Sequence, residues 1–134
     1  MSRSRASAKA AGARFERAIA DYLAAALNDD RIDRRVKRGA DDRGDIAGVR
    51  TIRGGRVVLE LKDVSRDGLP AWVDEAEVER GNDDAVIGAV IHKRRGVGNP
   101  GDQFVTMTVD NFVRLLEGGS PEWPVVQDPM SRSI

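Results

Sequence analysis

Apolar residues recur along the chain at two different spacings, and these spacings predict its helices and strands. Over residues 7–27 they return every three or four positions in an alanine-rich stretch, which is typical of an amphipathic helix with Ser7 as its N-cap. Residues 71–80 follow the same rhythm, and Pro70 suits the first turn of that helix. A third helix is expected between residue 108 and the start of the tail at residue 118. The sequence therefore predicts three helices in all.

The second and third helices are each expected to bury one apolar stripe. In the second helix the stripe consists of Trp72, Val73, Ala76 and Val78. The acids of that helix are expected to face outward, and they are Asp74, Glu75, Glu77 and Glu79. The third helix is expected to be capped by Thr108 or Asp110 and to turn toward the core Phe112, Val113, Leu115 and Leu116.

Between these helices lie segments with strand-like patterns. Residues 31–38 are short and highly charged, which suits a strand at the edge of a sheet. Residues 44–62 hold two apolar runs around a turn, and residues 103–108 form a short last strand. Residues 84–92 are almost all apolar, which indicates a strand covered on both faces. This order of elements predicts an α/β fold with a mixed β-sheet of about five strands flanked by helices.

Length and composition bound the organisation of the chain. Its 134 residues suit one domain, expected over 7–117, between a disordered segment 1–6 and an extended C-terminal tail 118–134. The absence of cysteine excludes disulfides and thiolate metal sites. The longest apolar run, 85–91, is too short to span a membrane, and the N-terminus lacks the apolar region of a signal peptide. We therefore expect a soluble, cytoplasmic protein. Three apolar residues of the tail are candidates for docking on this subunit or another: Trp123, Val125 and Val126.

The predicted hairpin over 44–62 carries the most informative polar residues. Successive side chains on a strand point to opposite faces, so Glu60 and Lys62 share one face of the second arm. The Gly54-Gly55 pair marks the turn. A two-residue turn places Asp45 on the same face as Glu60, whereas a three-residue loop places Asp45 on the other face.

Two carboxylates beside an ammonium suit phosphodiester hydrolysis. Carboxylate oxygens hold a hard divalent cation, and the lysine can orient the attacking water or neutralise developing charge. The alternative is a surface hairpin with one exposed Glu–Lys pair. Lys62 argues against it, because only four of the 22 basic residues are lysines and this one lies within an apolar strand. Asp41 and Asp42 are rival metal ligands in the preceding loop, where aspartates also serve as turn residues.

The charge of the chain is balanced, with 22 basic and 22 acidic residues, but it is unevenly distributed. Basic residues gather in separate segments, whereas acids concentrate in 74–84. Separate basic patches suit contact with the phosphates of DNA on one face, and solvated arginines on the surface are the alternative. The candidate DNA-binding residues are Arg14, Arg35, Lys37, Arg38, Arg43, Lys93, Arg94 and Arg95.

The order of elements, together with Gly44-Asp45, the 60–62 segment ELK and Glu16 in an early helix, resembles the PD-(D/E)XK nuclease superfamily. Within it the chain is most similar to Holliday junction resolvases of the archaeal and phage type, which begin with a G-x-x-x-E-R helix like residues 12–17. The segment VIHKRRG, residues 90–96, also resembles phage members. The likeness covers residues 12–116. It departs from the family where a proline before the first aspartate is replaced by Gly44.

The resemblance implies a restriction-endonuclease-like fold and a metal-dependent endonuclease of DNA recombination and repair. It implies Asp45 and Glu60 as ligands of Mg²⁺, with Mn²⁺ as a substitute, and Lys62 as the residue that positions the attacking water. Glu16 would be a fourth catalytic member that reaches a metal directly or through water, although by residue type a salt bridge is its ordinary role. The resemblance also implies a homodimer, because a four-way DNA junction needs two symmetric cuts. A phage-encoded origin fits the same likeness.

Two alternatives to a junction resolvase stay open at this stage. One is another PD-(D/E)XK DNase, of repair or restriction type, and the other is a non-catalytic DNA-binding module with the same fold. Three further residues are interpreted mainly as packed groups. His92 ends a buried strand and is expected to be packed or hydrogen-bonded, with DNA contact as the lesser alternative, and Trp72 and Phe104 are expected in the core.

Overall fold

A five-stranded mixed sheet organises the computed structural model, which describes residues 4–36 and 42–122. The strands lie side by side in chain order: β1 (Asp33–Arg34), β2 (Ile46–Ala47), β3 (Val57–Lys62), β4 (Ile87–His92) and β5 (Phe104–Thr106). Neighbouring strands are antiparallel except β3 and β4, which run parallel and are joined by a helix. The predicted α/β class and mixed sheet are confirmed, and β1 lies at an edge as its charge indicated.

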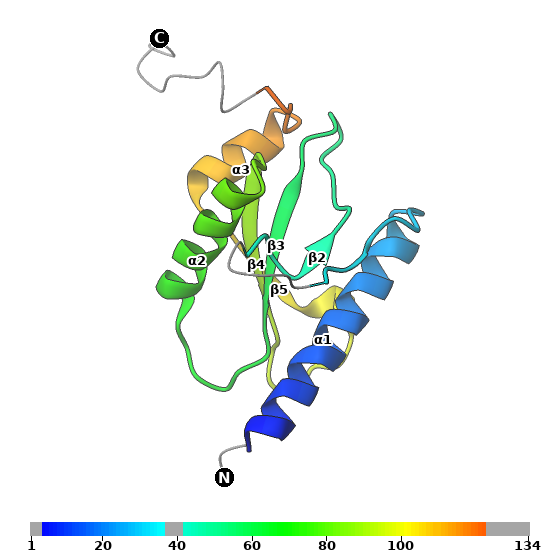
Figure 1. The fold of residues 1–134 in the computed structure, drawn as a ribbon, viewed down its shortest axis with the longest axis vertical. Helices are drawn as coiled ribbons and strands as arrows, with labels where there is room; N and C mark the ends of the chain where they lie inside the picture. Colours follow the sequence, from blue (N-terminus) through cyan, green and yellow to red (C-terminus); the bar gives the residue numbers. More distant parts are fainter. Residues whose placement is uncertain (1–3, 37–41, 123–134) are drawn as a thin grey trace.

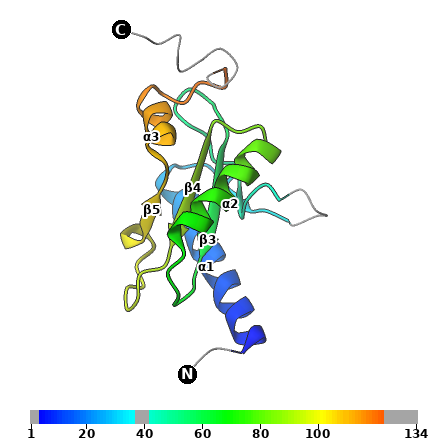
Figure 2. The same ribbon diagram turned by 90° about the vertical axis from the view of Figure 1, so that its left-hand side faces the viewer.

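Helices cover both faces of this sheet (Figures 1 and 2). Helix α1 (Arg5–Ala26) packs with Phe15 and Ile19 against the face that carries Leu59 and Ile91. Helices α2 (Leu69–Asn82) and α3 (Val109–Leu116) lie side by side on the opposite face, and a short 3-10 helix, η1 (Pro100–Asp102), precedes β5. Because side chains alternate along β3, Glu60 and Lys62 point to the α2 side, away from the main apolar core.

Two helices begin with a hydroxyl cap. The cap of helix α1 lies three residues earlier than the predicted Ser7, because Ser4 accepts a hydrogen bond from the Ser7 amide at 3.1 Å. Helix α3 is capped by Thr108, one of the two predicted residues, which accepts from the Asn111 amide at 3.1 Å. Both caps satisfy amides that the first helical turn leaves without an intrahelical partner.

The loop of the central hairpin is longer than the two-residue turn that the sequence analysis required. Thr51 donates its amide to the Gly55 carbonyl at 2.8 Å, which leaves three loop residues, 52–54. Yet Arg50 pairs with Arg56, and Ile46 pairs with Leu59, so the first arm has one residue more between these pairs than the second arm. This β-bulge shifts the register by one and returns Asp45 to the face of Glu60.

Gly48 makes the bulge possible. It has a φ of +88°, a left-handed conformation that side chains disfavour. A Cβ atom at this position would lie 2.4 Å from the carbonyl oxygen of Arg31, at the start of the neighbouring edge segment. The glycine therefore fixes both the bulge and the close approach of the chain before β1.

The buried faces of α2 and α3 differ from the predicted stripes. In α2, Ala76 is buried as expected, but Glu79 is only 1% exposed and Val78 is 64% exposed, so the predicted orientations of these two residues are wrong. In α3 the buried residue is Asn111, which accepts from the Gly88 amide at 3.2 Å. Phe112, Leu115 and Leu116 are exposed, which contradicts their predicted place in the core.

Candidate metal and nuclease site

Asp45, Glu60 and Lys62 gather on the α2 face of the sheet. Asp45 is 1% exposed, and its Oδ2 accepts the Leu61 amide of β3 at 2.8 Å. Its backbone amide donates to the Leu59 carbonyl at 2.8 Å, so two hydrogen bonds fix Asp45 against β3. The carboxyl group of Asp45 acts on the titration of both Glu60 and Lys62, as expected for close neighbours.

Gly44 explains why the chain lacks the proline expected before Asp45. Its φ is +92°, whereas proline is confined to about −65°. A Cβ atom here would lie 2.9 Å from Val58 Cγ1 and 3.0 Å from the Leu59 carbonyl oxygen. The backbone that delivers Asp45 to β3 therefore needs glycine at this position.

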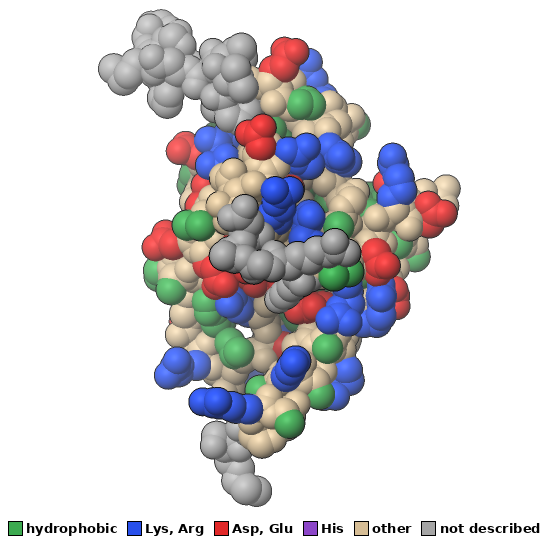
Figure 3. All heavy atoms as spheres, viewed as in Figure 1, with side chains coloured by type: hydrophobic (Ala, Val, Ile, Leu, Met, Phe, Trp, Pro, Cys, Tyr) green, Lys and Arg blue, Asp and Glu red, His purple; other side chains and the backbone are tan. Residues whose placement is uncertain are grey.

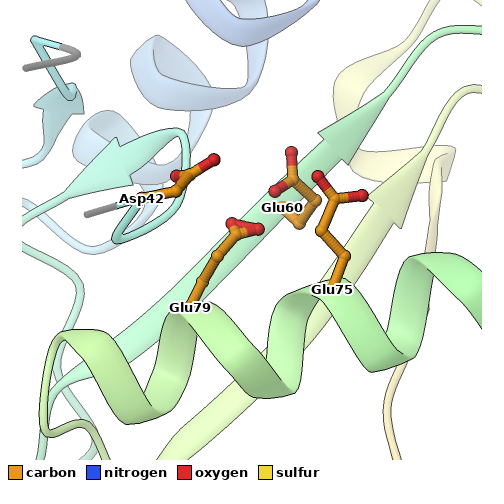
Figure 4. A group of neighbouring side chains, drawn as sticks. All are labelled: Asp42, Glu60, Glu75 and Glu79. Carbon is orange, nitrogen blue, oxygen red and sulfur yellow. The ribbon is translucent and has the colours of Figure 1, made fainter. Parts of the chain in front are cut away.

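Three further acids surround Glu60, and sequence reasoning did not place two of them here. Asp42 comes from the loop before β2, and Glu75 and Glu79 come from α2 (Figure 4). Their side chains point toward Glu60, and one carboxylate oxygen of each of the four lies within 4.8 Å of the others. Oxygen ligands at such separations can converge on one hard divalent cation. Asp42, a rival ligand in the sequence analysis, therefore belongs to this acidic group.

Burial makes this acidic group costly without a cation. Glu60 is 5% exposed and Glu79 is 1% exposed. Three buried oxygens, Glu60 Oε2 and both carboxylate oxygens of Glu79, accept no hydrogen bond from a backbone amide or a basic side chain in the described part of the chain. Two carboxylates about 5 Å apart repel by about 3 kcal/mol at an effective dielectric constant near 20. A divalent cation would relieve this repulsion.

The titration of Glu60 and Glu79 reflects the same crowding. Burial raises the pKa of Glu60, and the neighbouring carboxyl groups of Glu79 and Asp45 raise it further. Burial also raises the pKa of Glu79, and the charges of Asp42, Glu75 and Asp45 add to this, while a hydrogen bond from Glu60 offsets part of the rise. Without a cation, therefore, Glu60 and Glu79 keep their protons to higher pH than exposed glutamates do.

Lys62 is held as an ammonium at the rim of this acidic group. Its Nζ lies 2.9 Å from Glu75 Oε1 in an ion pair. Burial alone would lower the pKa of Lys62, but the hydrogen bond to Glu75 and the charges of Glu60, Glu75 and Asp45 raise it overall. A protonated lysine can donate to a water or to a phosphoryl oxygen, and it cannot accept a proton as a general base.

Glu16 lies apart from the four acids of this group. It is on α1, which covers the other face of the sheet, and its Oε1 accepts from Arg34 Nε and a terminal guanidinium nitrogen at 3.2 and 3.0 Å. This ion pair is the ordinary role that the sequence analysis gave it as an alternative. A catalytic role for Glu16 remains a proposal that requires its release from Arg34.

The spacing of the acids in α2 is the one sequence signal for its contribution to the site. Glu75 and Glu79 are four residues apart, so they lie on one helical face, and that face also carries buried Ala76. The hydropathy pattern favoured Val78 for the buried stripe, because an apolar residue is normally preferred over an acid there. The pattern within α2 holds no information about Glu60 on the neighbouring strand, toward which the inward Glu79 points.

The candidate DNA-binding residues divide into groups with different surroundings. Figure 3 shows Lys and Arg side chains spread over the visible face in several groups, with acidic side chains between them. Arg35 and Arg43 both lie near Asp83, with nitrogen–oxygen distances of 3.8 and 3.9 Å. Lys37 and Arg38 lie outside the described residues, as do the tail residues considered for docking.

The candidates around the loop after β4 have structural contacts. Lys93 donates to the carbonyls of Arg94 and Val97, at 3.1 and 2.6 Å, and so closes its own loop. Arg94 lies 4.5 Å above the ring of Phe104. Arg95 is exposed. Arg14 lines a small pocket of about 170 Å³ between α1 and this loop, which Lys93 also borders.

His92 is packed, as its place in the chain suggested. Its Nε2 lies 2.9 Å from Thr106 Oγ1, and its ring lies 6.0 Å from the ring of Trp72 and 5.9 Å from that of Phe104. Burial lowers the pKa of His92, which favours a neutral ring at neutral pH. Trp72 is partly buried, whereas Phe104 is 52% exposed and so is not the core residue that was predicted.

Comparison with known proteins finds no matching family model, no similar curated protein and no similar solved structure. None of the helices within residues 4–36 and 42–122 is both long and apolar enough to cross a membrane. A function for this chain therefore has to be inferred from its own side chains.

Proposed function

We propose that the protein is a metal-dependent, structure-selective DNA endonuclease of the PD-(D/E)XK type, and that it is a Holliday junction resolvase acting in the cytoplasm on four-way DNA junctions. The observation that carries the proposal is the meeting of Asp45, Glu60 and Lys62 on one face of the sheet, beside buried carboxylates that lack a fixed donor. A surface hairpin with an exposed Glu–Lys pair does not explain this burial.

The donor set fits Mg²⁺ or Mn²⁺. All four acids supply hard oxygen ligands, and the buried oxygens of Glu60 and Glu79 need a positive partner. Glu60 and Glu79 would hold the ion, with Asp42 and Glu75 at its exposed side. Asp45, which lies beside Glu60 but outside this group of four, would be a further ligand. The bound ion supplies a water of lowered pKa and polarises a phosphoryl oxygen.

The roles of the protein groups follow from their positions. Asp45 is fixed by two hydrogen bonds to β3, so its carboxylate is already in place and does not have to move when the ion binds. The Lys62 ammonium can exchange Glu75 for the attacking water or for a phosphate oxygen, where it would stabilise developing negative charge. Basic groups at Arg35 and Arg43 would contact the DNA backbone nearby.

The exposed apolar side of α3 supports a homodimer. Val109, Phe112 and Leu116 lie at spacings of three and four, so they form one stripe, and they are 76, 49 and 69% exposed. A single copy leaves this stripe in solvent. A second copy related by a two-fold axis would cover both stripes at once and would provide two equivalent sites for paired cuts.

Cleavage of defined DNA substrates tests this function. Labelled four-way junction, Y-fork and linear duplex are incubated with the protein in Mg²⁺ or EDTA. The wild type should place symmetric nicks in the junction only and only with Mg²⁺. Glu60→Ala should lower cleavage at least a hundredfold, since it removes a ligand, while Asp30→Asn, an exposed acid outside the site, should leave cleavage unchanged.

The other outcomes assign other functions. Equal cutting of duplex and junction would replace the resolvase with a general nuclease of the same superfamily. Binding of DNA without cutting, in Mg²⁺ and in Mn²⁺, would leave a non-catalytic DNA-binding module and would overturn the enzyme.

A further inference from the structure

Three arginines from separate segments converge on Asp83, the residue that caps the C-terminus of α2. Arg35 follows β1, Arg43 precedes β2, and Arg56 precedes β3. Their guanidinium nitrogens lie 3.8, 3.9 and 3.5 Å from the Asp83 carboxylate. We call Arg35, Arg43 and Arg56 the arginine cluster.

The charges of this cluster are not balanced by Asp83. Three guanidinium groups face one carboxylate that is itself nearly buried, at 7% side-chain exposure. The distances are longer than those of a charge-assisted hydrogen bond, which is about 2.8 Å. Asp83 therefore keeps the three side chains together and offsets only one of their three charges.

The donors of the cluster are only partly used. Arg56 donates to the carbonyl of Asp83 at 3.0 Å and so also holds the end of α2. Arg35 Nε is buried and has no hydrogen-bond partner in the part of the chain that the structure describes. A buried guanidinium donor without an acceptor is costly, and an anion that enters the cluster would satisfy it.

The arginine cluster lies next to the acidic group. Asn82, which precedes Asp83, donates its side-chain amide to the Asp42 carbonyl at 2.9 Å. Glu79 is four residues before Asp83 on α2, which is a distance of about 6 Å along the helix axis. Successive phosphates of one DNA strand are about 3.4 Å apart along the duplex axis. A strand with one phosphate at the acidic group would thus bring a neighbouring phosphate to the arginines.

We propose that the arginine cluster is a binding site for a phosphate of the DNA backbone, one or two nucleotides from the phosphate that is cut. This rests on the proposed function in taking DNA as the polyanion. It adds Arg56 to the expected contacts and gives Asp83 the role of a positioning residue. The cluster would fix the register of the strand, and the acidic group would carry out the chemistry.

DNA binding without cleavage tests this site. Binding of a fluorescent four-way junction is measured by anisotropy in EDTA, over a series of salt concentrations. Arg43→Gln is the main variant, because Arg43 is 51% exposed and its loss should leave the fold intact. Loss of one phosphate contact should weaken binding roughly tenfold and lower the slope of log affinity against log salt by about one.

Two further variants sharpen the test. The double variant Arg35→Gln/Arg43→Gln should lower the slope by about two, with melting temperature recorded to confirm folding. Arg5→Gln is the matched control, since it removes the same charge at the exposed start of α1. It should change neither affinity nor slope by more than the measurement error.

The outcomes separate this site from the nuclease. A folded Arg43→Gln protein with the slope and affinity of Arg5→Gln overturns the phosphate site, even if the wild type cuts junctions. A lowered slope in a protein that never cuts DNA supports the phosphate site and overturns the nuclease. A wild type that does not bind DNA at all overturns the phosphate site directly.

Discussion

Glu79 has the most unusual environment of the individual residues, because its carboxyl group is buried against another carboxyl group. Its pKa and that of Glu60 are raised above the usual value of 4.5 in the folded protein. The folded chain therefore keeps protons that the unfolded chain has already released. Without a divalent cation, the free energy of unfolding should fall as pH rises from about 4.5 toward 7.

Replacing Glu79 tests this linkage. In EDTA at pH 7.5, Glu79→Gln should raise the free energy of unfolding by roughly 1–3 kcal/mol, since an unpaired buried charge is removed. It should also flatten the decline of melting temperature between pH 5 and pH 8. Thermal melts over this range provide the measurement.

Glu77→Gln, on the same helix, is the control for this prediction. Glu77 pairs with Arg80 at 3.1 Å and also accepts a hydrogen bond from Asn111. Glutamine keeps an acceptor oxygen for Asn111, so this change should lower stability slightly or leave it unchanged. A Glu79→Gln protein that is less stable than the wild type at pH 7.5 in EDTA would show that Glu79 is not strained.

Single residues were predictable to different degrees. Glu60 and Lys62 followed from strand alternation, which is a geometric rule that depends little on context. Asp45 did not, because the two-residue turn that its prediction required is absent and only the bulge returns it to their face. Glu79 did not follow, because an acid is normally assigned to the solvent side of a helix. Its carboxylate lies beside that of Glu60 on another element, and no local pattern encodes such an arrangement.

Among the secondary-structure elements, the first arm of the hairpin has the feature with the largest effect on the site, which is the bulge between Ile46 and Arg50. It compensates for the three-residue loop and keeps Asp45 opposite Glu60. The strands and the need for a defined register were predictable from the sequence. The bulge was not, because the sign of a bulge in a sequence is at most a glycine. Gly48 could not be distinguished from the other glycines of the hairpin without the backbone angles.

Substitution of Gly48 tests the bulge. Gly48→Ala should lower the free energy of unfolding by about 2–4 kcal/mol, from left-handed strain and from the overlap with the Arg31 carbonyl. Gly54→Ala is a close control, because Gly54 has the same φ of +88° and nothing within 4 Å of a Cβ atom. It should lose only about 1 kcal/mol. Equal losses in chemical denaturation of the two variants would contradict the account of the bulge.

Helix α3 shows how far an amphipathic pattern can mislead. Phe112, Leu115 and Leu116 were expected inside, yet Asn111 takes the inner position because its side chain accepts from the Gly88 amide and donates to Thr108. A hydropathy pattern identifies which residues share a face of a helix. It does not show whether that face packs on the core of the same chain, lies in solvent or contacts another subunit. An outward apolar face is consistent with a second subunit.

The whole molecule is predicted to be a homodimer through α3. Light scattering after gel filtration should give twice the chain mass of 14.6 kDa for the wild type. Phe112→Asp/Leu116→Asp should give a folded monomer, because charges would have to be buried in the interface. Val78→Asp changes an exposed apolar residue on α2 and should remain a dimer.

Loss of the dimer should also remove the paired cutting of junctions. The monomeric variant should still bind divalent cations but should lose paired nicking of junctions, because it has one active site per molecule. A wild type that is monomeric at micromolar concentration would contradict the dimer and, with it, the symmetric cutting of junctions.

The overall architecture was the most predictable level. Helical and strand periodicities gave the three helices and the mixed sheet, because they reflect burial on one or both faces of each element. Functional identity depends on how the elements meet. The parallel pairing of β3 with β4 brings α2 across β3, and this crossover delivers Glu75 and Glu79 to Glu60.

The proposed function requires one cation held between the hairpin and α2, and a thermal melt with and without divalent metal measures its binding directly. Addition of Mg²⁺ or Ca²⁺ at a hundred times its dissociation constant should stabilise the wild type by about 2.7 kcal/mol, which is a rise of several degrees in melting temperature. Asp45→Ala and Glu60→Ala should show little or no rise, while Asp30→Asn should behave like the wild type. A wild type whose melting temperature is unmoved by Mg²⁺, Mn²⁺ and Ca²⁺ would contradict the proposed site.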